Sequence, residues 1–132
     1  MLYVVFDTNV IVSAMLSHNP QSSTVKVVES ITLGKVTPLY NEEILAEYDD
    51  VLHRTKFNLD EADVSNMIGA VIKLVVRVDR IESGDRFPDP ADAVFFEAAL
   101  SKDGSFLVTG NIRHYPQNPI VVTPSELLAI IV

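Results

Sequence analysis

Five short apolar runs alternate along the chain with longer segments of helical patterning. The runs, rich in β-branched and aromatic residues, cover positions 2–6, 36–40, 74–78, 105–109 and 120–123. The helical segments cover 9–17, 22–33, 41–54, 60–72, 89–102 and 124–131. Almost wholly apolar strands that alternate with helices are typical of a parallel sheet covered on both faces. The sequence therefore predicts an open α/β sandwich around a central, mainly parallel sheet of five strands.

The length and hydropathy of the chain set its expected organisation. With 132 residues and neither repeats nor linkers, it is expected to form a single domain over 1–132. No apolar run approaches the roughly 20 residues of a membrane-spanning helix. The N-terminus also lacks the basic region of a signal peptide. We therefore expect a cytoplasmic protein without a membrane segment.

The charged and sulfur-containing residues exclude several classes of site. The chain has no cysteine, which excludes thiolate metal sites, disulfides and cysteine nucleophiles. Any metal must be held by oxygen or imidazole. The net charge of -8 argues against a broad phosphate-binding face, because such faces are built from clustered Lys and Arg.

Asp7, Thr8 and Asn9 follow the first predicted strand directly. In open parallel sheets, ligands bind outside the carboxyl ends of the strands, near the point where the strand order reverses. Asp7 is therefore a candidate ligand-binding residue. The alternative is a helix cap, because Asp, Thr and Asn are all favourable at the first position before a helix.

The segment 41–54 begins at a capping residue, Asn41, and carries a second candidate carboxylate. Glu47 lies on the border of the apolar face, whereas Glu42, Glu43 and Asp50 are expected to face solvent. Asp49 lies on the opposite border and remains an alternative to Glu47. The residues that define this face by helical spacing are Ile44, Leu45, Tyr48, Val51 and Leu52. The other interpretation is an acidic surface helix, in which glutamates favour the positive N-terminal end.

A third carboxylate is expected in the first turn of the helix over 89–102. Asp89 followed by Pro90 is typical of a cap with proline at the first helical position. Asp92 then falls at the third helical position, where an acid can complete a capping box or project into a cleft. Both roles are compatible, with Asp89 as the cap and Asp92 as the ligand.

The run 105–109 ends in Thr109, Gly110 and Asn111, again at the carboxyl edge of the sheet. These three residues are candidate site residues, although a simple exit turn would also use Gly and Asn. His114 is favoured as a surface or interface residue. His18 and His53 lack the spacing of metal ligands. The polar segment 80–92 is favoured as a functional loop over a domain boundary.

Taken together, these motifs resemble a PIN domain, and in particular the bacterial PIN proteins grouped as toxins of toxin-antitoxin systems. The resemblance spans essentially the whole chain through four motifs in order: DTN at 7–9, Glu47 in EILAEYDDVLHR, Asp92 in DPADAVFFEAAL, and LVTGN at 107–111. It implies a three-layer α/β/α sandwich and a Mg²⁺- or Mn²⁺-dependent ribonuclease. By motif position it implies acidic ligands at Asp7, Glu47 and Asp92, with Asn9 and Thr109 in support.

The chain departs from the family at Asn111, where an aspartate is usual. Asn111 could offer an oxygen to a metal ion but no negative charge, so a second metal site would be weak and Asn111→Asp would strengthen divalent binding. The alternative is that Asn111 only shapes the turn after Gly110. A catalytically weakened, partner-binding PIN fold is therefore a competing hypothesis.

A hard divalent cation gives the clustered carboxylates a physical purpose. Close carboxylates repel one another, and a bound cation offsets that repulsion and supplies positive charge toward a phosphodiester. The expected partners are single-stranded RNA, a cognate antitoxin and a second copy of the chain in a homodimer. Further substrate contacts are expected from a small rim: Arg86, Lys102, Arg113 and His114.

A phospho-acceptor receiver domain is the remote alternative. It shares the size of the chain, an acidic pocket and a parallel sheet. Asp79 lies late for the phosphorylated aspartate, and Thr123 occupies the position that needs a lysine.

Overall fold

The computed structural model describes residues 2–73 and 76–131, and it forms a five-stranded parallel sheet. The strands lie in the order β3-β2-β1-β4-β5. Their bounds are β1 (Leu2–Phe6), β2 (Val36–Tyr40), β3 (Val76–Arg77), β4 (Phe106–Val108) and β5 (Val121–Val122). Each predicted run therefore contributes a strand, although β4 and β5 are shorter than expected. The first two positions of the predicted run 74–78 lie outside the described residues.

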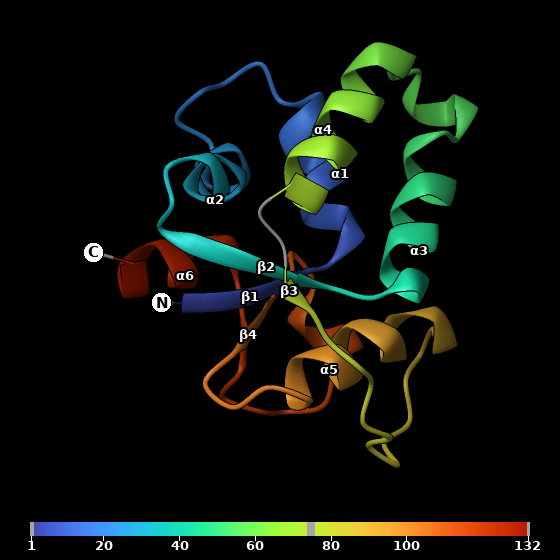
Figure 1. Cartoon of the computed structure of the whole chain (residues 1–132), viewed down its shortest axis with the longest axis vertical. Helices are drawn as coiled ribbons and strands as arrows, with labels where there is room; N and C mark the ends of the chain where they lie inside the picture. Colours follow the sequence, from blue (N-terminus) through green and yellow to red (C-terminus); the bar gives the residue numbers. More distant parts are fainter. Residues whose placement is uncertain (1, 74–75, 132) are drawn as a thin grey trace.

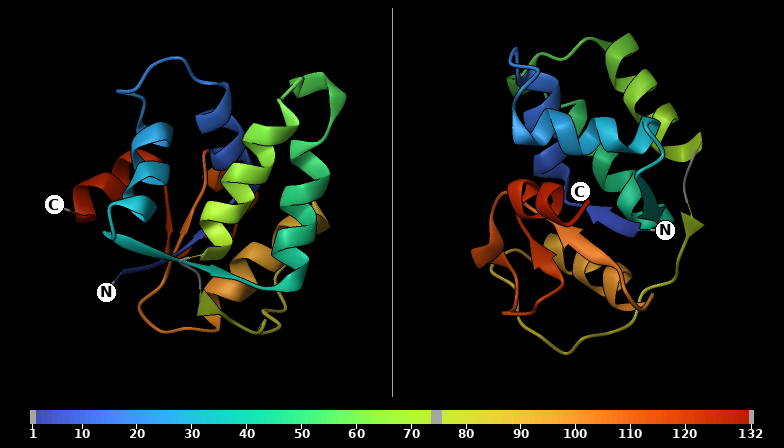
Figure 2. Two further views of the ribbon diagram at one scale, coloured as in Figure 1. Left: turned by 45° about the horizontal axis from the view of Figure 1, so that its top comes forward. Right: turned by 90° about the vertical axis from the view of Figure 1, so that its left-hand side faces the viewer.

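Helices cover both faces of the sheet, which confirms the predicted three-layer α/β/α architecture (Figure 1). Above the sheet in Figure 1 lie α1 (Thr8–Leu16), α2 (Ser23–Thr32), α3 (Glu42–Leu52) and α4 (Glu61–Lys73). On the opposite face, α5 (Ala93–Leu100) packs against β1, β2 and β4. The C-terminal helix α6 (Pro124–Ile131) packs beside α2, as Figure 2 also shows. No helix in the described ranges combines the length and apolar character needed to cross a bilayer.

The central strands are buried because helices cover them on both sides. Val4, Val5 and Phe6 of β1 are at most 1% exposed, and Leu107 and Val108 of β4 are fully buried. This burial explains why the sequence shows continuous apolar runs where a half-exposed strand would alternate. Beside them on α5, Phe95 and Phe96 are equally buried and fill the layer beneath the sheet.

The strand order reverses between β1 and β4. From β1 the chain moves outward through β2 to β3, and it then returns to the other side of β1 as β4 and continues to β5. The register pairs Phe6 with Val108, so both strands end level with each other. The backbone N–H of Asp7 donates to the carbonyl of Val108 at 2.9 Å. Asp7 and Thr109 therefore leave the sheet side by side at its switch point, which is the expected ligand-binding edge.

This strand order excludes the receiver-domain alternative. Receiver domains have the order 2-1-3-4-5. In this chain the second strand separates the first from the third. Asp79 lies just beyond β3, where it pairs with Arg77, and is not at the end of a central strand.

Two predicted helical segments differ from the structure at one end, where a 3₁₀ turn adjoins the regular helix. The segment 41–54 ends its regular helix at Leu52, and a short 3₁₀ turn, η1 (Thr55–Phe57), follows it. The segment 89–102 begins as a 3₁₀ turn, η2 (Pro90–Asp92), before α5 starts at Ala93. Asp89 caps η2 by accepting the backbone N–H of Ala91 at 3.0 Å, as the sequence predicted. The capping-box interpretation of Asp92 is wrong, because its side chain makes no capping hydrogen bond.

Candidate functional site

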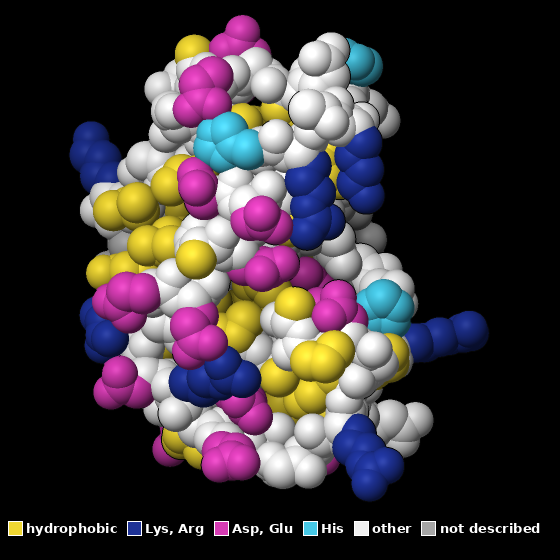
Figure 3. Space-filling view, turned by 90° about the vertical axis from the view of Figure 1, so that its right-hand side faces the viewer, with side chains coloured by type: hydrophobic (Ala, Val, Ile, Leu, Met, Phe, Trp, Pro, Cys, Tyr) yellow, Lys and Arg dark blue, Asp and Glu magenta, His cyan; other side chains and the backbone are white. Residues whose placement is uncertain are grey.

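A pocket of about 680 Å³ opens at the switch point, between α1, the C-terminal part of α3 and the start of α5. Figure 3 shows Asp and Glu side chains gathered around a hollow on this side of the molecule, with Lys and Arg side chains close by. We call this the acidic pocket. Its four carboxylates are Asp7, Glu47, Asp89 and Asp92.

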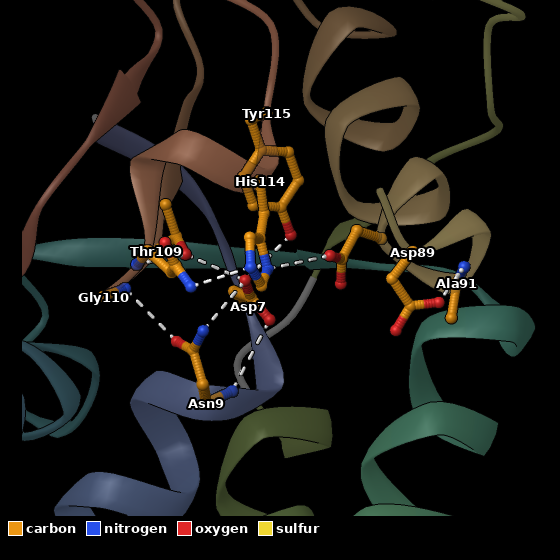
Figure 4. Close-up of polar contacts among 10 residues, drawn as sticks. Asp7, Asn9, Asp89, Ala91, Thr109, Gly110, His114 and Tyr115 are labelled. Atoms are coloured by element: carbon orange, nitrogen blue, oxygen red, sulfur yellow. Dashed lines mark hydrogen bonds and ion pairs between the residues drawn. The ribbon is translucent and has the colours of Figure 1, made fainter. Parts of the chain in front are cut away.

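Asp7 forms the floor of the acidic pocket and is only 5% exposed. Its Oδ2 atom accepts hydrogen bonds from the Thr109 hydroxyl at 2.9 Å and the Tyr115 hydroxyl at 2.8 Å. The Asn9 side chain donates to the same oxygen at 3.3 Å (Figure 4). Burial and the neighbouring Asp7 raise the pKa of the Tyr115 hydroxyl, so Tyr115 stays a donor. Residues from three separate segments therefore fix the orientation of this carboxylate.

Asn9 and Thr109 also tie β4 to the start of α1. The side-chain oxygen of Asn9 accepts the backbone N–H of Gly110 at 3.2 Å, and Figure 4 shows the two residues facing each other. The helix-cap contact from the Asn9 backbone to Asp7 is long, at 3.5 Å. Asp7 thus caps α1 weakly, while its other oxygen is held by side chains.

Glu47 reaches the acidic pocket from α3. It is half-buried, whereas Glu42, Glu43, Asp49 and Asp50 are exposed, which confirms the expected border position. Beside it, the buried Tyr48 hydroxyl donates to the Phe6 carbonyl at 2.5 Å and so fixes α3 to the end of β1. Burial first, and then the charges of Asp50, Asp89 and Asp7, raise the pKa of Glu47, although Arg54 opposes this shift.

Asp92 faces the acidic pocket from the opposite side, and its side chain is 15% exposed. Burial, together with the charges of Asp7 and Asp89, raises its pKa from 3.8 to about 6. The imidazole of His114 lies beside it, with Nδ1 3.5 Å from Asp92 Oδ2. Burial without a strong cationic partner is the physical cause of this raised pKa.

Asn111 and His114 occupy the short turn after β4, within and beside η3 (Ile112–His114). His114 lines the acidic pocket and Asn111 does not. The Asn111 amide nitrogen lies 2.9 Å from His114 Nε2, and its backbone N–H donates to the Thr109 hydroxyl at 3.0 Å. Asn111 therefore contacts His114, which lines the pocket, and Thr109, which holds Asp7.

The rim residues separate into two groups. Arg86 and Arg113 are exposed on segments that flank Asp89 and His114. Lys102 lies at the opposite, amino edge of the sheet, where its Nζ sits 4.3 Å from the ring centroid of Tyr3. The structure thus does not bring Lys102 to the acidic pocket.

The donor chemistry of the acidic pocket fits a hard divalent cation, but its geometry is not preformed. Carboxylates that raise one another's pKa are the oxygen donors that Mg²⁺ and Mn²⁺ prefer. The Thr8 hydroxyl lines the same pocket and is, within the described residues, buried without any hydrogen-bond partner. However, no three His, Asp or Glu side chains in the described part of the chain converge closely enough to hold a metal ion as they stand.

Several pocket residues escaped the sequence analysis. Arg54 follows Glu47 by seven residues, about two helical turns, and this spacing could have indicated that both lie on one side. Asp89 was expected only as a cap, yet it also lines the pocket. Tyr115 had no pattern to identify it, because its contact with Asp7 joins positions 108 residues apart.

Sequence comparison agrees with this geometry. A family model described as PIN domain matches residues 3–113, which include Asp7, Glu47, Asp92 and Asn111. No curated protein matches the chain. The family match gives the chain a nuclease-type fold.

Proposed function

We propose that this chain, which belongs to the PIN domain family, is a Mg²⁺- or Mn²⁺-dependent endoribonuclease that hydrolyses RNA phosphodiester bonds. One observation carries the proposal. Carboxylates from the residue after β1, from α3 and from η2 line one pocket at the switch point of a parallel sheet, and there burial and mutual repulsion raise the pKa values of Glu47 and Asp92. Acids with strongly shifted pKa values concentrate at functional sites, because in other parts of a protein they would only lower its stability.

The side chains have distinct roles in this proposal. Asp7 is held by Thr109, Tyr115 and Asn9, so the orientation of its carboxylate is fixed before a cation binds. Glu47 and Asp92 have no comparable partners and can turn their oxygens toward a cation. When bound, the cation would lower the pKa of a coordinated water and stabilise charge on the leaving oxygen.

The remaining walls of the acidic pocket favour a single-stranded substrate. Beyond the carboxylates, the pocket is lined by apolar side chains that include Leu16, Val51 and Phe57. An unpaired base can pack on such a surface, whereas a base inside a duplex cannot reach it. Arg54 is the one Lys or Arg among the described residues that line this pocket. We assign it a contact with a flanking phosphate, with Arg86 and Arg113 as outer contacts.

Cleavage assays on a short single-stranded RNA test the proposal. Wild type is expected to cut in Mn²⁺ or Mg²⁺, and excess EDTA is expected to stop the reaction. Glu47→Gln should remove activity, whereas Glu42→Gln should not, because Glu42 is exposed on the same helix and pairs with Arg77. Cleavage that survives EDTA, or equal activity in Glu47→Gln and wild type, would contradict the proposal. RNA that stays intact although Mn²⁺ binds would favour the partner-binding alternative.

A toxin role belongs to the same proposal. It places the protein in the cytoplasm, as a homodimer that a cognate antitoxin inhibits. A reading frame directly upstream, whose product co-purifies with this chain and blocks cleavage, is the expected observation. A monomer in light scattering would contradict the dimer.

A further inference from the structure

Asn111 lies at the centre of a chain of polar contacts that joins two pocket carboxylates. Toward Asp7, its backbone N–H donates to the Thr109 hydroxyl at 3.0 Å, and that hydroxyl donates to Asp7 Oδ2 at 2.9 Å. Toward Asp92, its side-chain amide meets His114 Nε2 at 2.9 Å. The far side of the same imidazole, Nδ1, lies 3.5 Å from Asp92 Oδ2. Figure 4 shows His114 directed toward this cluster beside Asp7.

The proton positions along this chain follow from the chemistry of the two groups. An amide nitrogen can only donate, so His114 Nε2 must accept. A neutral imidazole that accepts at one nitrogen carries its hydrogen on the other. His114 therefore holds its hydrogen on Nδ1, which faces Asp92. The amide of Asn111 thus selects the tautomer in which His114 presents a donor to the carboxylate.

We propose that Asn111 is a positioning residue that fixes the tautomer and orientation of His114, and that His114 in turn orients the Asp92 carboxylate. In this arrangement His114 Nδ1–H restrains one oxygen of Asp92 and leaves the other for the acidic pocket. Position 111 then acts from outside the shell of cation ligands. Its effect on a cation rests on the proposed function, whereas its effect on His114 does not.

The direct test is the ¹⁵N chemical shift pattern of the His114 ring at a pH where the ring is neutral and no metal is present. Wild type is expected to show Nδ1–H as the major tautomer. Asn111→Asp replaces the donor with an acceptor of the same shape, so Nε2–H should become the major form. Asn118→Asp is the matched control, because Asn118 uses its side-chain oxygen to accept from Ile120, and an aspartate retains that contact.

A double-mutant cycle on Mn²⁺ affinity tests the consequence by calorimetry. Asn111→Ala and His114→Ala are each expected to weaken Mn²⁺ binding about tenfold, the loss typical of residues that orient metal ligands. The double variant should be no weaker than His114→Ala alone, because Asn111 acts through His114.

Three outcomes would overturn the inference. They are a wild-type ring with Nε2–H as the major tautomer, additive losses in the double variant, and an Asn111→Asp variant that binds Mn²⁺ more tightly with its tautomer unchanged. The last two would place Asn111 among the direct ligands. If wild type binds no Mn²⁺, the proposed function fails, but the tautomer measurement still decides the role of Asn111.

Discussion

Two acids on one short segment, Asp92 and Glu97, are both largely buried yet have opposite surroundings. The Glu97 side chain is 8% exposed, and it accepts hydrogen bonds from Arg80 at 2.5 Å and from the Ser83 backbone at 2.9 Å. Burial opposes its ionisation, but these donors and the Ser83 hydroxyl outweigh burial and lower its pKa. The Asp92 side chain is 15% exposed, and its pKa rises to about 6.

This is the difference expected between an acid that serves the fold and an acid that serves the proposed site. We call Arg80, Ser83 and Glu97 the loop anchor, because together they fix the segment that leads to Asp89. Arg80 also reaches Glu43 on α3 at 2.5 Å, so the loop anchor joins the two helical segments that carry Glu47 and Asp92. Removing a buried acid from its donors leaves those donors unpaired and lowers stability, whereas a buried acid without such donors costs stability itself and is typical of functional sites.

The largest expected effect comes from Asp92→Asn. Because the amide offers no negative charge to a cation, metal-dependent cleavage should fall by about 100-fold or more. Without metal, the same change removes like-charge repulsion and should raise the free energy of unfolding by on the order of 1 kcal/mol. Cleavage rates and urea unfolding in EDTA measure the two effects. A loss of stability in Asp92→Asn would contradict the contrast with Glu97.

Glu97→Gln should show the opposite behaviour. Losing charge-assisted hydrogen bonds in a buried setting should lower the free energy of unfolding by about 1–3 kcal/mol. Glu42→Gln is the matched control, because its pair with Arg77 is exposed and screened by solvent, so it should contribute much less. Urea denaturation of both variants makes the comparison. Equal decreases in the free energy of unfolding would mean that the burial of the loop anchor does not increase its contribution to stability.

The stability from Glu97 should also depend on pH in a defined direction. Its pKa is lowered in the folded protein, so its contribution is complete above the ordinary value of 4.5 and is lost as the pH falls through the folded value. The difference in unfolding free energy between wild type and Glu97→Gln should therefore be constant near neutral pH and shrink in acid. Chemical denaturation from pH 7 to 3 measures it, and a difference that is as large at pH 3 as at pH 7 would contradict this account.

The smallest expected effect concerns the rim of the acidic pocket. Arg54→Gln should raise KM for single-stranded RNA by about 3- to 10-fold with little change in kcat, because a flanking contact stabilises the ground and transition states alike. The ion pair between Arg54 and Asp50 is exposed, so its loss should not lower the stability of the fold. Lys102→Gln is the control and should leave KM unchanged. An equal rise in both variants would mean that the substrate extends to the amino edge of the sheet.

Local patterns predicted the position of every strand and the three principal carboxylates. The apolar runs gave β1 and β2 with their bounds, because both are central and buried. β4 and β5 are each one residue shorter than the predicted run at both ends, although the backbone of Leu107 still donates to Ile120 at 2.8 Å. Helical spacing placed Glu47 at the border of the core, where the structure also finds it.

The contacts of Asn111 depended on tertiary structure. From sequence, the family resemblance implied that Asn111 offers an oxygen to a metal ion, with a role in the turn after Gly110 as the alternative. In the structure, the Asn111 amide contacts His114, and of these two residues only His114 lines the acidic pocket. The direction of a side chain in a short turn depends on the neighbours that it meets, and spacing along the chain does not contain that information.

The sequence by itself determined the layered α/β fold and the edge at which the acids gather, because apolar periodicity and strand-end residues are local properties. Only the tertiary structure decided which acids are satisfied. Asp7 is held by Thr109 and Tyr115, and Glu97 by Arg80 and Ser83, whereas the one ion-pair partner of Asp92 among the described residues is His114. The ionisation of a carboxyl depends on its burial and on donors brought close by folding, some from more than 100 residues away in the chain, so these differences arise only when the sheet assembles.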